Sequence, residues 1–596
     1  MTRALRARRP ARWPFLLLFV PGIAAAQVTP GLPTGAGGPG PDADKKDGVA
    51  EQAPKTPGLL PTTPTLPPPK GKHKRFELIE LDGYFRLRSD WMKNFNLGFI
   101  DDPDLGGAPF PEPLGCSAPT SGSAGDTADR PCGDSIKSTN MRLRLEPTIN
   151  LDETTSVHMQ VDVLDNVVLG STPTTGQGLG LAAFEDTQGV PQAGINSAED
   201  AIRVKRAWAE VATPLGIVKF GRQPDAWGMG MFHNSGSADP INGGYDLDSE
   251  RGDTVDRVMF GTLIPGTQLR GAIAMDFPMT GRTSAQTGGT PRGQGWDLDD
   301  NDDVRQWSFV LSHLDTPDDF RDAVERGELT MNYGVYLQYR KQAWDYTGAG
   351  VSDTPDPDAF VPRDATAYIP DLWLKLGYKQ LQLELEGVAI VGSINKATDV
   401  GIDQALDLRQ FGGVGRVTYR AVQDKLKVGL EVGGASGDQW DNDPQGSTHI
   451  STANTLGGAR DGTLSWFRFD PEYKIDLILF RELIGAVTNA AYAKPFLSYQ
   501  LTKGITARIA NVTSFALKPV ATPGNGSLYG VEFDGDLGYT ATNGFSAGIA
   551  YGVLFPLSAM NHPEDPSTGS GFGYGAGNTG DAGNAHTIQF RLGLSF

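Results

Sequence analysis

The C-terminal segment HTIQFRLGLSF alternates strictly between apolar and polar residues. One face carries Ile588, Phe590, Leu592, Leu594 and Phe596, and the other carries Gln589, Arg591, Gly593 and Ser595. A period of two is the pattern of a β-strand with one apolar and one wet face. The last strand of a soluble sheet can look the same, so the meaning of the segment depends on whether its pattern recurs.

The same alternation recurs from Leu81 onward, for example in DGYFRLRSDW, MRLRLEPTINL, SVHMQVDVL, NYGVYLQYR and LQLELEG. In several of these segments the polar face is charged, which the core of a soluble β-sandwich would not tolerate. We count about eighteen such segments. Their centres lie near residues 86, 145, 161, 207, 221, 259, 272, 309, 335, 372, 387, 413, 431, 496, 510, 534, 550 and 591.

The connections between these segments alternate between long and short. Short turns are DETT, TPLG, PG, KQ, AVQD, TKG and TATNG, and longer segments rich in Gly, Asp, Ser and Pro lie between them. One turn of the short set, TPDDFRDAVERG, predicts a helix capped by Thr316 and ended by Gly327. The rhythm predicts an all-β fold, a transmembrane antiparallel up-and-down barrel of about eighteen strands with short periplasmic turns and long extracellular loops.

The longest loop, from Asp438 to Thr488, contains the apolar run DLILFRELI (Asp476–Ile484). An apolar run should not face water, so we expect it to fold into the barrel as a constriction loop. Asp476, Arg481 and Glu482 are its candidate eyelet residues. The alternative is a hidden hairpin, which would bring the barrel to twenty strands.

Composition sets the domain boundaries. Residues 1–26 read as a signal peptide, with five arginines, a short apolar run and small residues before Gln27. Residues 27–75 are Pro-rich and poor in large apolar side chains, which predicts a disordered periplasmic segment. Residues 76–596 hold the predicted barrel. The chain has 76 Gly and 42 Pro, typical of turns and strands.

Charge excludes one class of partner. Without the five leader arginines, the 52 Lys and Arg residues fall to 47, against 71 Asp and Glu, so the mature chain carries a formal charge of −24. Such a surface will not seek nucleic acid by electrostatics. In an exported chain the two cysteines, Cys116 and Cys132, are expected to form a disulfide. No nearby ligand set would complete a zinc site.

The polar faces of the predicted strands define a candidate pore lining. Its members are Arg86, Arg88, Asp90, Arg142, Arg144, Glu146, His158, Gln160, Asp162, Arg206, Glu210, Gln338, Arg340, Lys375, Glu384, Glu386, Arg416, Glu431, Arg508, Glu532, Asp534, Asp536 and Arg591. A basic stripe on the first two strands and acidic stripes on later ones would set up a transverse field that favours polar solutes. The alternative is mutual neutralisation in ladders of ion pairs.

Two further features leave alternatives open. Strict alternation places Arg222 of KFGRQP on the lipid-facing row, but a bulge at Gly221 would turn it inward, and we include Arg222 in the predicted pore lining. DLDDNDD (Asp297–Asp303) spaces oxygen ligands as a calcium loop does, but it lacks the Gly and the final Glu of an EF-hand. A solvated acidic loop is the simpler interpretation, and we predict no metal site.

Catalytic motifs are missing from the sequence. It contains no G-x-S-x-G, no H-E-x-x-H and no Gly-rich phosphate loop, and its seven histidines are scattered. We therefore predict that the protein is not an enzyme and needs no cofactor.

Several stretches together resemble a family of exported outer-membrane β-barrel proteins of myxobacterial type, of uncharacterised function. The matching pieces include GYFRLRSDWMKNFNLG, IRVKRAWAEVATPLGIVKFGRQPDAWGMGM, FDPEYKIDLILFRELIGAVTNAAYAKP and YGVEFDGDLGYTATNGFSAGIAYGVLFP. The resemblance runs from Gly83 to Pro556. It implies a barrel in the outer membrane of a Gram-negative bacterium, and it supplies no substrate.

The first functional hypothesis is a porin for passive diffusion of small hydrophilic solutes through a charged aqueous lumen. The alternative is a structural or adhesive surface barrel with a plugged lumen. Expected partners are outer-membrane lipid and the barrel-assembly machinery, whose client signature the last strand, ending in Phe596, resembles. A homotrimer is open, since no stripe in the sequence marks an interface.

Overall fold

The computed structural model describes residues 78–100, 109–111, 113, 133–170, 196–236, 247–250, 252–285, 293–346, 360–396, 405–438, 462–563, 574 and 578–596. The predicted signal peptide, the Pro-rich segment 27–75 and both cysteines lie outside these residues. Among the described helices, none is long and apolar enough to cross a membrane.

Most of the described chain is β-strand, because the two-residue alternation seen in the sequence runs through each segment. The strands are β1 (Ile79–Lys93), β2 (Ser135–Asn150), β3 (Thr155–Val168), β4 (Ile202–Thr213), β5 (Gly216–Pro224), β6 (Thr254–Leu263), β7 (Leu269–Met279), β8 (Val304–His313), β9 (Thr330–Tyr346), β10 (Phe360–Tyr378), β11 (Leu381–Ile394), β12 (Leu406–Ala421), β13 (Leu426–Ala435), β14 (Thr463–Leu464), β15 (Ala490–Gln500), β16 (Ile505–Ala516), β17 (Leu528–Thr540), β18 (Phe545–Pro556) and β19 (Ala585–Ser595).

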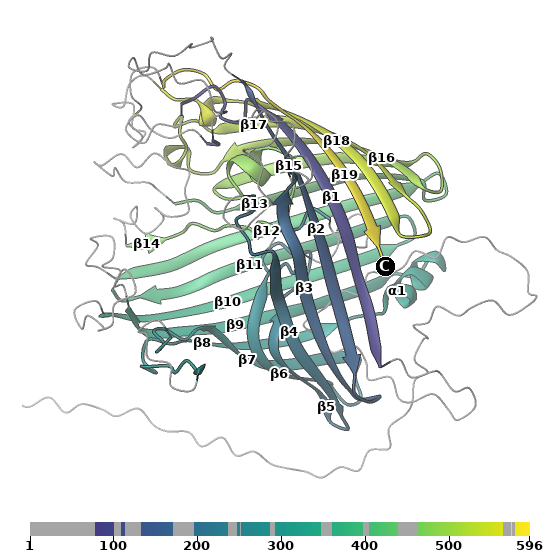
Figure 1. The fold of residues 1–596 in the computed structure, drawn as a ribbon, viewed down its shortest axis with the longest axis vertical. Helices are drawn as coiled ribbons and strands as arrows, with labels where there is room; N and C mark the ends of the chain where they lie inside the picture. The colour runs from purple at the N-terminus through teal and green to yellow at the C-terminus, as the bar shows by residue number, and fades with distance from the viewer. Residues whose placement is uncertain are drawn as a thin grey trace, which may run out of the picture. The chain divides into compact units, whose positions relative to one another are not determined.

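Eighteen of these strands close into one antiparallel barrel (Figure 1). Each long strand pairs with the next along the chain, and β19 pairs with β1 to close the ring. Gly83 and Phe596 exchange two backbone hydrogen bonds of 3.0 Å at that seam. The predicted barrel is therefore confirmed.

The alternative of twenty strands is wrong. β13 pairs directly with β15, so no hairpin from the long loop enters the ring. The two-residue β14 only adds a short parallel pairing beside β12.

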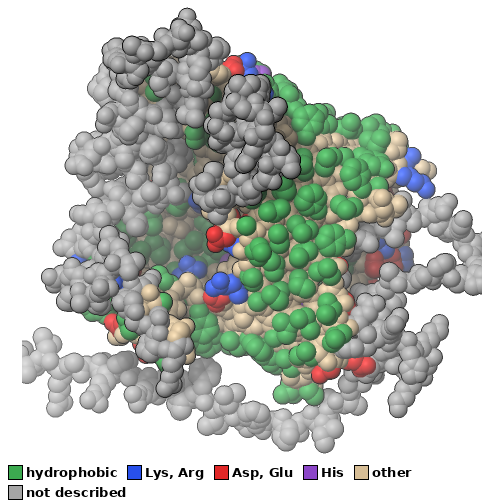
Figure 2. Space-filling view, in the orientation of Figure 1, with side chains coloured by type: hydrophobic (Ala, Val, Ile, Leu, Met, Phe, Trp, Pro, Cys, Tyr) green, Lys and Arg blue, Asp and Glu red, His purple; other side chains and the backbone are tan. Residues whose placement is uncertain are grey.

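The outer face of the barrel is apolar. Outward side chains such as Phe85, Phe309, Phe533, Phe590 and Leu592 are each at least two-fifths exposed. Figure 2 shows one side of the barrel as a broad field of hydrophobic side chains, with charged side chains near its margins. Large exposed apolar surfaces are unfavourable in water, so this field fits contact with lipid.

The connections follow the predicted rhythm, with short turns at one end of the barrel and long segments at the other (Figure 1). The one helix among the short turns, α1 (Pro317–Glu325), begins after Thr316, whose side chain accepts a hydrogen bond from the Asp319 amide. Gly327 follows with a φ of 77°. Phe320 packs over Gly377 of β10, where a Cβ would lie 2.8 Å from its ring.

Two segments from the long-loop end fold back against the inner wall. The first inner segment comprises residues 225–236, 247–250 and 252–253, between β5 and β6. The second inner segment comprises residues 465–489, between β13 and β15, and includes the π-helix η7 (Leu479–Leu483). Two short 3-10 helices, η8 (Pro519–Ala521) and η9 (Ser558–Met560), lie in later loops.

Candidate functional site: the charged inner wall and its two inner segments

Four arginines stand side by side on the inner face of β19, β1 and β2. Arg86 lies directly opposite Arg142 across the β1–β2 pair, and Arg88 lies opposite Arg591 across the β1–β19 pair. The side chains of Arg86 and Arg142 are fully buried. Like charges in opposed positions destabilise a sheet, and buried charges need partners, so this wall requires carboxylates from elsewhere.

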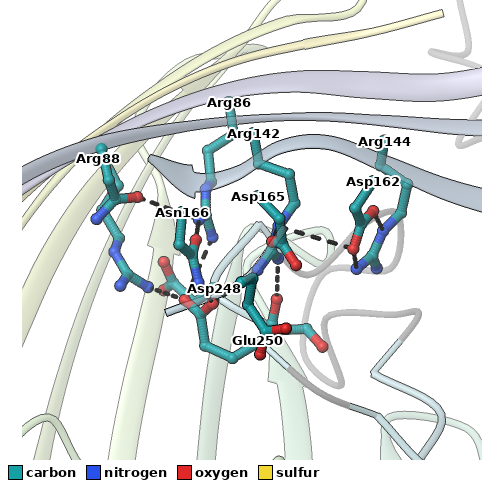
Figure 3. Close-up of polar contacts among 12 residues, drawn as sticks. Arg86, Arg88, Arg142, Arg144, Asp162, Asp165, Asn166, Asp248 and Glu250 are labelled. Carbon is teal, nitrogen blue, oxygen red and sulfur yellow. Dashed lines mark hydrogen bonds and ion pairs between the residues drawn. The ribbon is translucent and has the colours of Figure 1, made fainter. Parts of the chain in front are cut away.

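Glu250 of the first inner segment supplies one of these carboxylates (Figure 3). Its Oε1 lies 2.5 Å from Nη1 of Arg88 and 3.5 Å from Nη1 of Arg86. Its Oε2 lies 2.8 Å from Nη2 of Arg142. Asn166 bridges the group, because its side chain hydrogen-bonds to both Arg86 and Glu250. The single carboxylate of Glu250 thus offsets part of the positive charge of three arginines.

Asp248, which also belongs to the first inner segment, supplies a carboxylate to Arg591 on β19. Nε of Arg591 donates to Asp248 Oδ1 at 2.6 Å, and Nη1 of Arg481 lies 3.6 Å from Oδ2. The ammonium of Lys474 donates to the Asp248 carbonyl at 2.5 Å. Since Arg481 and Lys474 belong to the second inner segment, Asp248 joins the wall and both inner segments.

The wall also supplies some of its own counter-charges, from β3. Nε and Nη2 of Arg144 donate to the two oxygens of Asp162 at 2.7 and 2.9 Å, a bidentate pair. Nε of Arg142 donates to Asp165 at 2.5 Å. The arginines of β1 and β2 therefore receive carboxylate partners from β3 and from the first inner segment.

The charge of Glu250 is fixed by this arrangement. Burial alone would raise the pKa of Glu250, but the positive charges of Arg88, Arg86 and Arg142 outweigh it and hold the pKa below its ordinary value. Glu250 stays ionised at neutral pH.

The second inner segment is anchored by its backbone. Glu532 of β17 accepts hydrogen bonds from the amides of Leu477, Ile478 and Leu479, at 2.9, 2.8 and 3.0 Å. Three amides converging on one carboxyl group form an anion-binding cradle of the kind found at helix starts. Glu532 thus fixes the point at which the segment turns along the wall.

Asp476 orders the next turn of the same segment. Its carboxyl group accepts from the amides of Phe480 and Arg481, at 3.0 to 3.1 Å. Burial raises the pKa of Asp476 to about 6, against the opposing effect of these amides. Arg481 lies 3.2 Å from Glu482, so the structure brings together the three residues predicted for the constriction loop.

The inner wall beneath the second inner segment is apolar. Val388, Val414, Val512 and Leu554 occupy inward positions there, and they are buried in one cluster with Ile478, Phe480 and other residues of the segment. Gly412 leaves room for Phe467, because a Cβ at that position would lie 2.2 Å from the ring. Apolar packing therefore adds to the Glu532 anchor in holding the second inner segment, whereas ion pairs hold the first.

The two inner segments meet at a pair of carboxyl groups. Asp470 and Asp253 share a side-chain hydrogen bond, and the Asp470 amide donates to the Met231 carbonyl at 2.7 Å. Burial, followed by the charge of Asp253, raises the pKa of Asp470 to about 9. One carboxyl group can donate to the other only while it carries a proton, so the contact depends on that proton.

This pair predicts a contact that weakens with alkali. The pKa of Asp470 is raised above the unfolded value, so the folded state binds more protons than the unfolded state between about pH 4 and pH 9. The stabilisation is present at low pH and is lost as pH rises through about 9. We expect protease cleavage within the inner segments to increase as pH rises from about 4 to about 9, and to level off above that pH. Asp470→Asn keeps a neutral donor and should flatten the pH profile; an unchanged alkaline profile in this variant would contradict the assignment.

Other inward charges are paired across the opposite wall. Nε of Arg416 donates to Glu431 at 2.7 Å, and the Tyr492 hydroxyl donates to the same carboxylate at 2.8 Å. Arg508 lies 3.2 Å from Asp536. Charged stripes and ion-pair ladders are the two alternatives that the sequence leaves open for the inner wall. The structure contains both, because the basic stripe on β1 and β2 is paired with carboxylates and other inward charges form ion pairs between strands.

The structure places most of the predicted lining residues on the inward rows. These are Arg86, Arg88, Asp90, Arg142, Arg144, Glu146, His158, Gln160, Asp162, Arg206, Glu210, Gln338, Arg340, Lys375, Glu384, Glu386, Arg416, Glu431, Arg508, Glu532, Asp534, Asp536 and Arg591.

The inward prediction for Arg222 is wrong. The register of β5 is unbroken against both β4 and β6, so no bulge forms at Gly221. Arg222 shares its row with the exposed Phe220, on the outer face. There it forms a bidentate pair with Asp256, at 2.8 Å for both bonds.

Sequence reasoning missed a second buried charge cluster. Arg257 of β6 forms bonds of 2.5 and 2.8 Å to Asp276, lies 3.2 Å from Asp225 and donates to the Tyr336 hydroxyl at 2.6 Å. Asp225 begins the first inner segment, so this cluster fixes its start. Alternation within TVDRVMFGTL was a usable signal for Arg257, but nothing marked Asp225, Asp248 or Glu250 in an irregular loop.

Similar solved structures include OccK11 (OpdR) of Pseudomonas aeruginosa, which is 10% identical over 87% of this chain and 96% of that chain, with a TM-score of 0.42. A BenF-like porin from Pseudomonas fluorescens is 9% identical over 87% and 99%, with a TM-score of 0.39. The outer membrane channel DcaP of Acinetobacter baumannii is 10% identical over 87% and 97%, with a TM-score of 0.34. No protein-family model and no curated protein matches the chain, so the resemblance to a myxobacterial-type family stays a prediction.

Proposed function

We propose that the protein is an outer-membrane channel for the passive diffusion of small hydrophilic solutes. The observation that carries the proposal is the reversal of polarity across the barrel wall, which is apolar outside and lined with charged side chains inside. An eighteen-strand barrel is wider than side chains from its wall can fill, which favours an aqueous lumen. Charged linings pass polar solutes and reject apolar ones.

The two inner segments would set the size and charge of the pathway. The second inner segment narrows the lumen by apolar packing, and the first brings Asp248 and Glu250 to the arginines of the wall. In this proposal the short turns face the periplasm and the long loops face outward. The last strand, with Phe596 at the seam, would be the segment that the barrel-assembly machinery recognises.

Liposome swelling tests the proposal. Liposomes containing the refolded full-length chain should swell in isotonic solutions of small sugars, at a rate that falls as the sugar becomes larger. Liposomes with heat-denatured protein serve as the control. Swelling at the control rate for every sugar would contradict a diffusion channel.

One observation favours the alternative of a plugged structural or adhesive barrel. The two inner segments contact each other, through the Glu250 amide and Glu472 at 2.9 Å and through Lys474 and Asp248. A lumen closed by this contact would give no swelling in the intact protein. Swelling that appears only after deletion of Asp476–Ile484 would support the plugged barrel.

A further inference from the structure

The loop between β7 and β8 gathers carboxylates that the pore does not use. Within this loop Asp297, Asp302 and Asp303 each offer an oxygen, and these oxygens all lie within 4.8 Å of one another. The two arms of the loop are held together by a bridge between Thr283 and Asp297 and by the Leu298 amide, which donates to the Arg282 carbonyl at 3.1 Å. The convergence is therefore part of the loop's folded backbone.

Two of the converging carboxylates carry buried oxygens without partners. Asp302 is fully buried; its Oδ2 accepts from the Arg282 amide at 3.1 Å, whereas its Oδ1 has no hydrogen-bond partner among the residues that the structure describes. Oδ1 of Asp303 is also buried, and within the same described residues it has no partner. A buried, unsatisfied carboxylate oxygen is costly, and a cation is the partner that would satisfy it.

The surrounding charge reinforces this need. The guanidinium of Arg305 lies 3.8 Å from Asp303 Oδ2, beyond ordinary hydrogen-bond distance, and its side chain is more than half exposed. The charge of a distant, solvated arginine such as Arg305 does not offset three adjacent carboxylates.

We propose that Asp297, Asp302 and Asp303 form a binding site for a hard divalent cation, with calcium as the preferred ion. All three ligands are carboxylates, which suit calcium or magnesium rather than the metals that prefer nitrogen or sulfur. Calcium accepts six to eight oxygens in flexible geometry, so backbone carbonyls and water can complete the shell in an irregular loop. The bound ion would hold the turn from Asp297 to Asp303 closed.

The site has a built-in optical reporter. Trp296 precedes Asp297 in the chain, and the Trp344 amide donates to the Asn301 carbonyl at 3.1 Å. Terbium, which occupies calcium sites, emits when an excited tryptophan lies close by. We therefore expect saturable terbium emission from the refolded full-length protein, and we expect added calcium to displace the terbium, with magnesium much less effective.

Three variants test the assignment. Asp302→Asn and Asp297→Asn should each weaken calcium competition by about tenfold or more, because each removes one of the converging charges. Asp200→Asn removes an exposed carboxylate from a different loop and should leave the competition unchanged. Asp297 is exposed, so its replacement should not disturb folding, unlike replacement of the buried Asp302. Heat-modified gel mobility checks that the barrel is folded in every variant.

Equal calcium affinity in the wild type, Asp302→Asn and Asp297→Asn would overturn the proposal, as would the lack of any saturable calcium competition. Weakening in Asp200→Asn to the same extent would indicate a diffuse effect of surface charge, and would also overturn it. None of these outcomes depends on whether the barrel conducts.

Discussion

Removal of Asp476–Ile484, with a short Gly-Ser linker closing the gap, is expected to raise single-channel conductance by about twofold or more. The deleted residues contain η7 and the backbone amides that bind Glu532, so the second inner segment loses its anchor on β17. Ion flux through a narrow pore depends steeply on the smallest cross-section. Planar-bilayer recording of the refolded variant measures the change directly.

Two point variants separate the position of the segment from its charge. Glu532→Ala keeps every residue of the segment but removes the acceptor of three amides, and it should give a smaller, noisier increase in conductance. Glu482→Gln removes a charge and leaves those backbone bonds intact, so it should leave the mean conductance close to that of the wild type. Unchanged conductance after the deletion would place the second inner segment outside the conduction path.

The second large effect concerns ion selectivity. The double variant Asp248→Asn and Glu250→Gln should raise the permeability of chloride relative to potassium by about twofold or more. Both substitutions remove carboxylates that neutralise Arg86, Arg88, Arg142 and Arg591, so the arginines keep their charge and lose their counter-ions. The reversal potential in a KCl gradient reports the change.

Glu328→Gln is the matched control for this experiment, because Glu328 pairs with Arg326 in an exposed position at the short-turn end of the barrel. It removes one carboxylate from one arginine without touching the first inner segment, and it should leave the reversal potential unchanged. An unchanged reversal potential in the double variant, or a shift toward potassium, would contradict the claim that the arginines of β19, β1 and β2 set the selectivity of the conducting path.

Alternation in the sequence was sufficient for the barrel and for most of its inner rows. Each strand is long and repeats the same two-residue pattern, so local errors do not change its face. Arg591 illustrates this: its neighbours Phe590 and Leu592 are exposed outward, and it turns inward to Asp248. The prediction for Arg222 was wrong for the opposite reason, because we assumed a bulge at Gly221 where simple alternation gives the correct outward face.

The inner segments were less accessible from the sequence. DLILFRELI could be predicted to fold inward, because an apolar run in a loop needs a covered surface. The part of the barrel wall that it covers could not be predicted. Val388 and Val414 interrupt rows that also hold Glu386 and Arg416, and Val512 and Leu554 lie on rows with small residues; these positions have meaning only once the segment lies over them. Asp248 and Glu250 lie in a loop without periodicity, so only the folded structure joins them to the arginines.

The central claim is that the barrel encloses an aqueous pathway, and single-channel recording of the intact, refolded chain tests it most directly. A planar bilayer in KCl should show discrete current steps of uniform size, which grow when Asp476–Ile484 is deleted. Silent bilayers with both the intact and the deleted protein, at a protein level where heat-modified mobility confirms folded barrels, would contradict the claim.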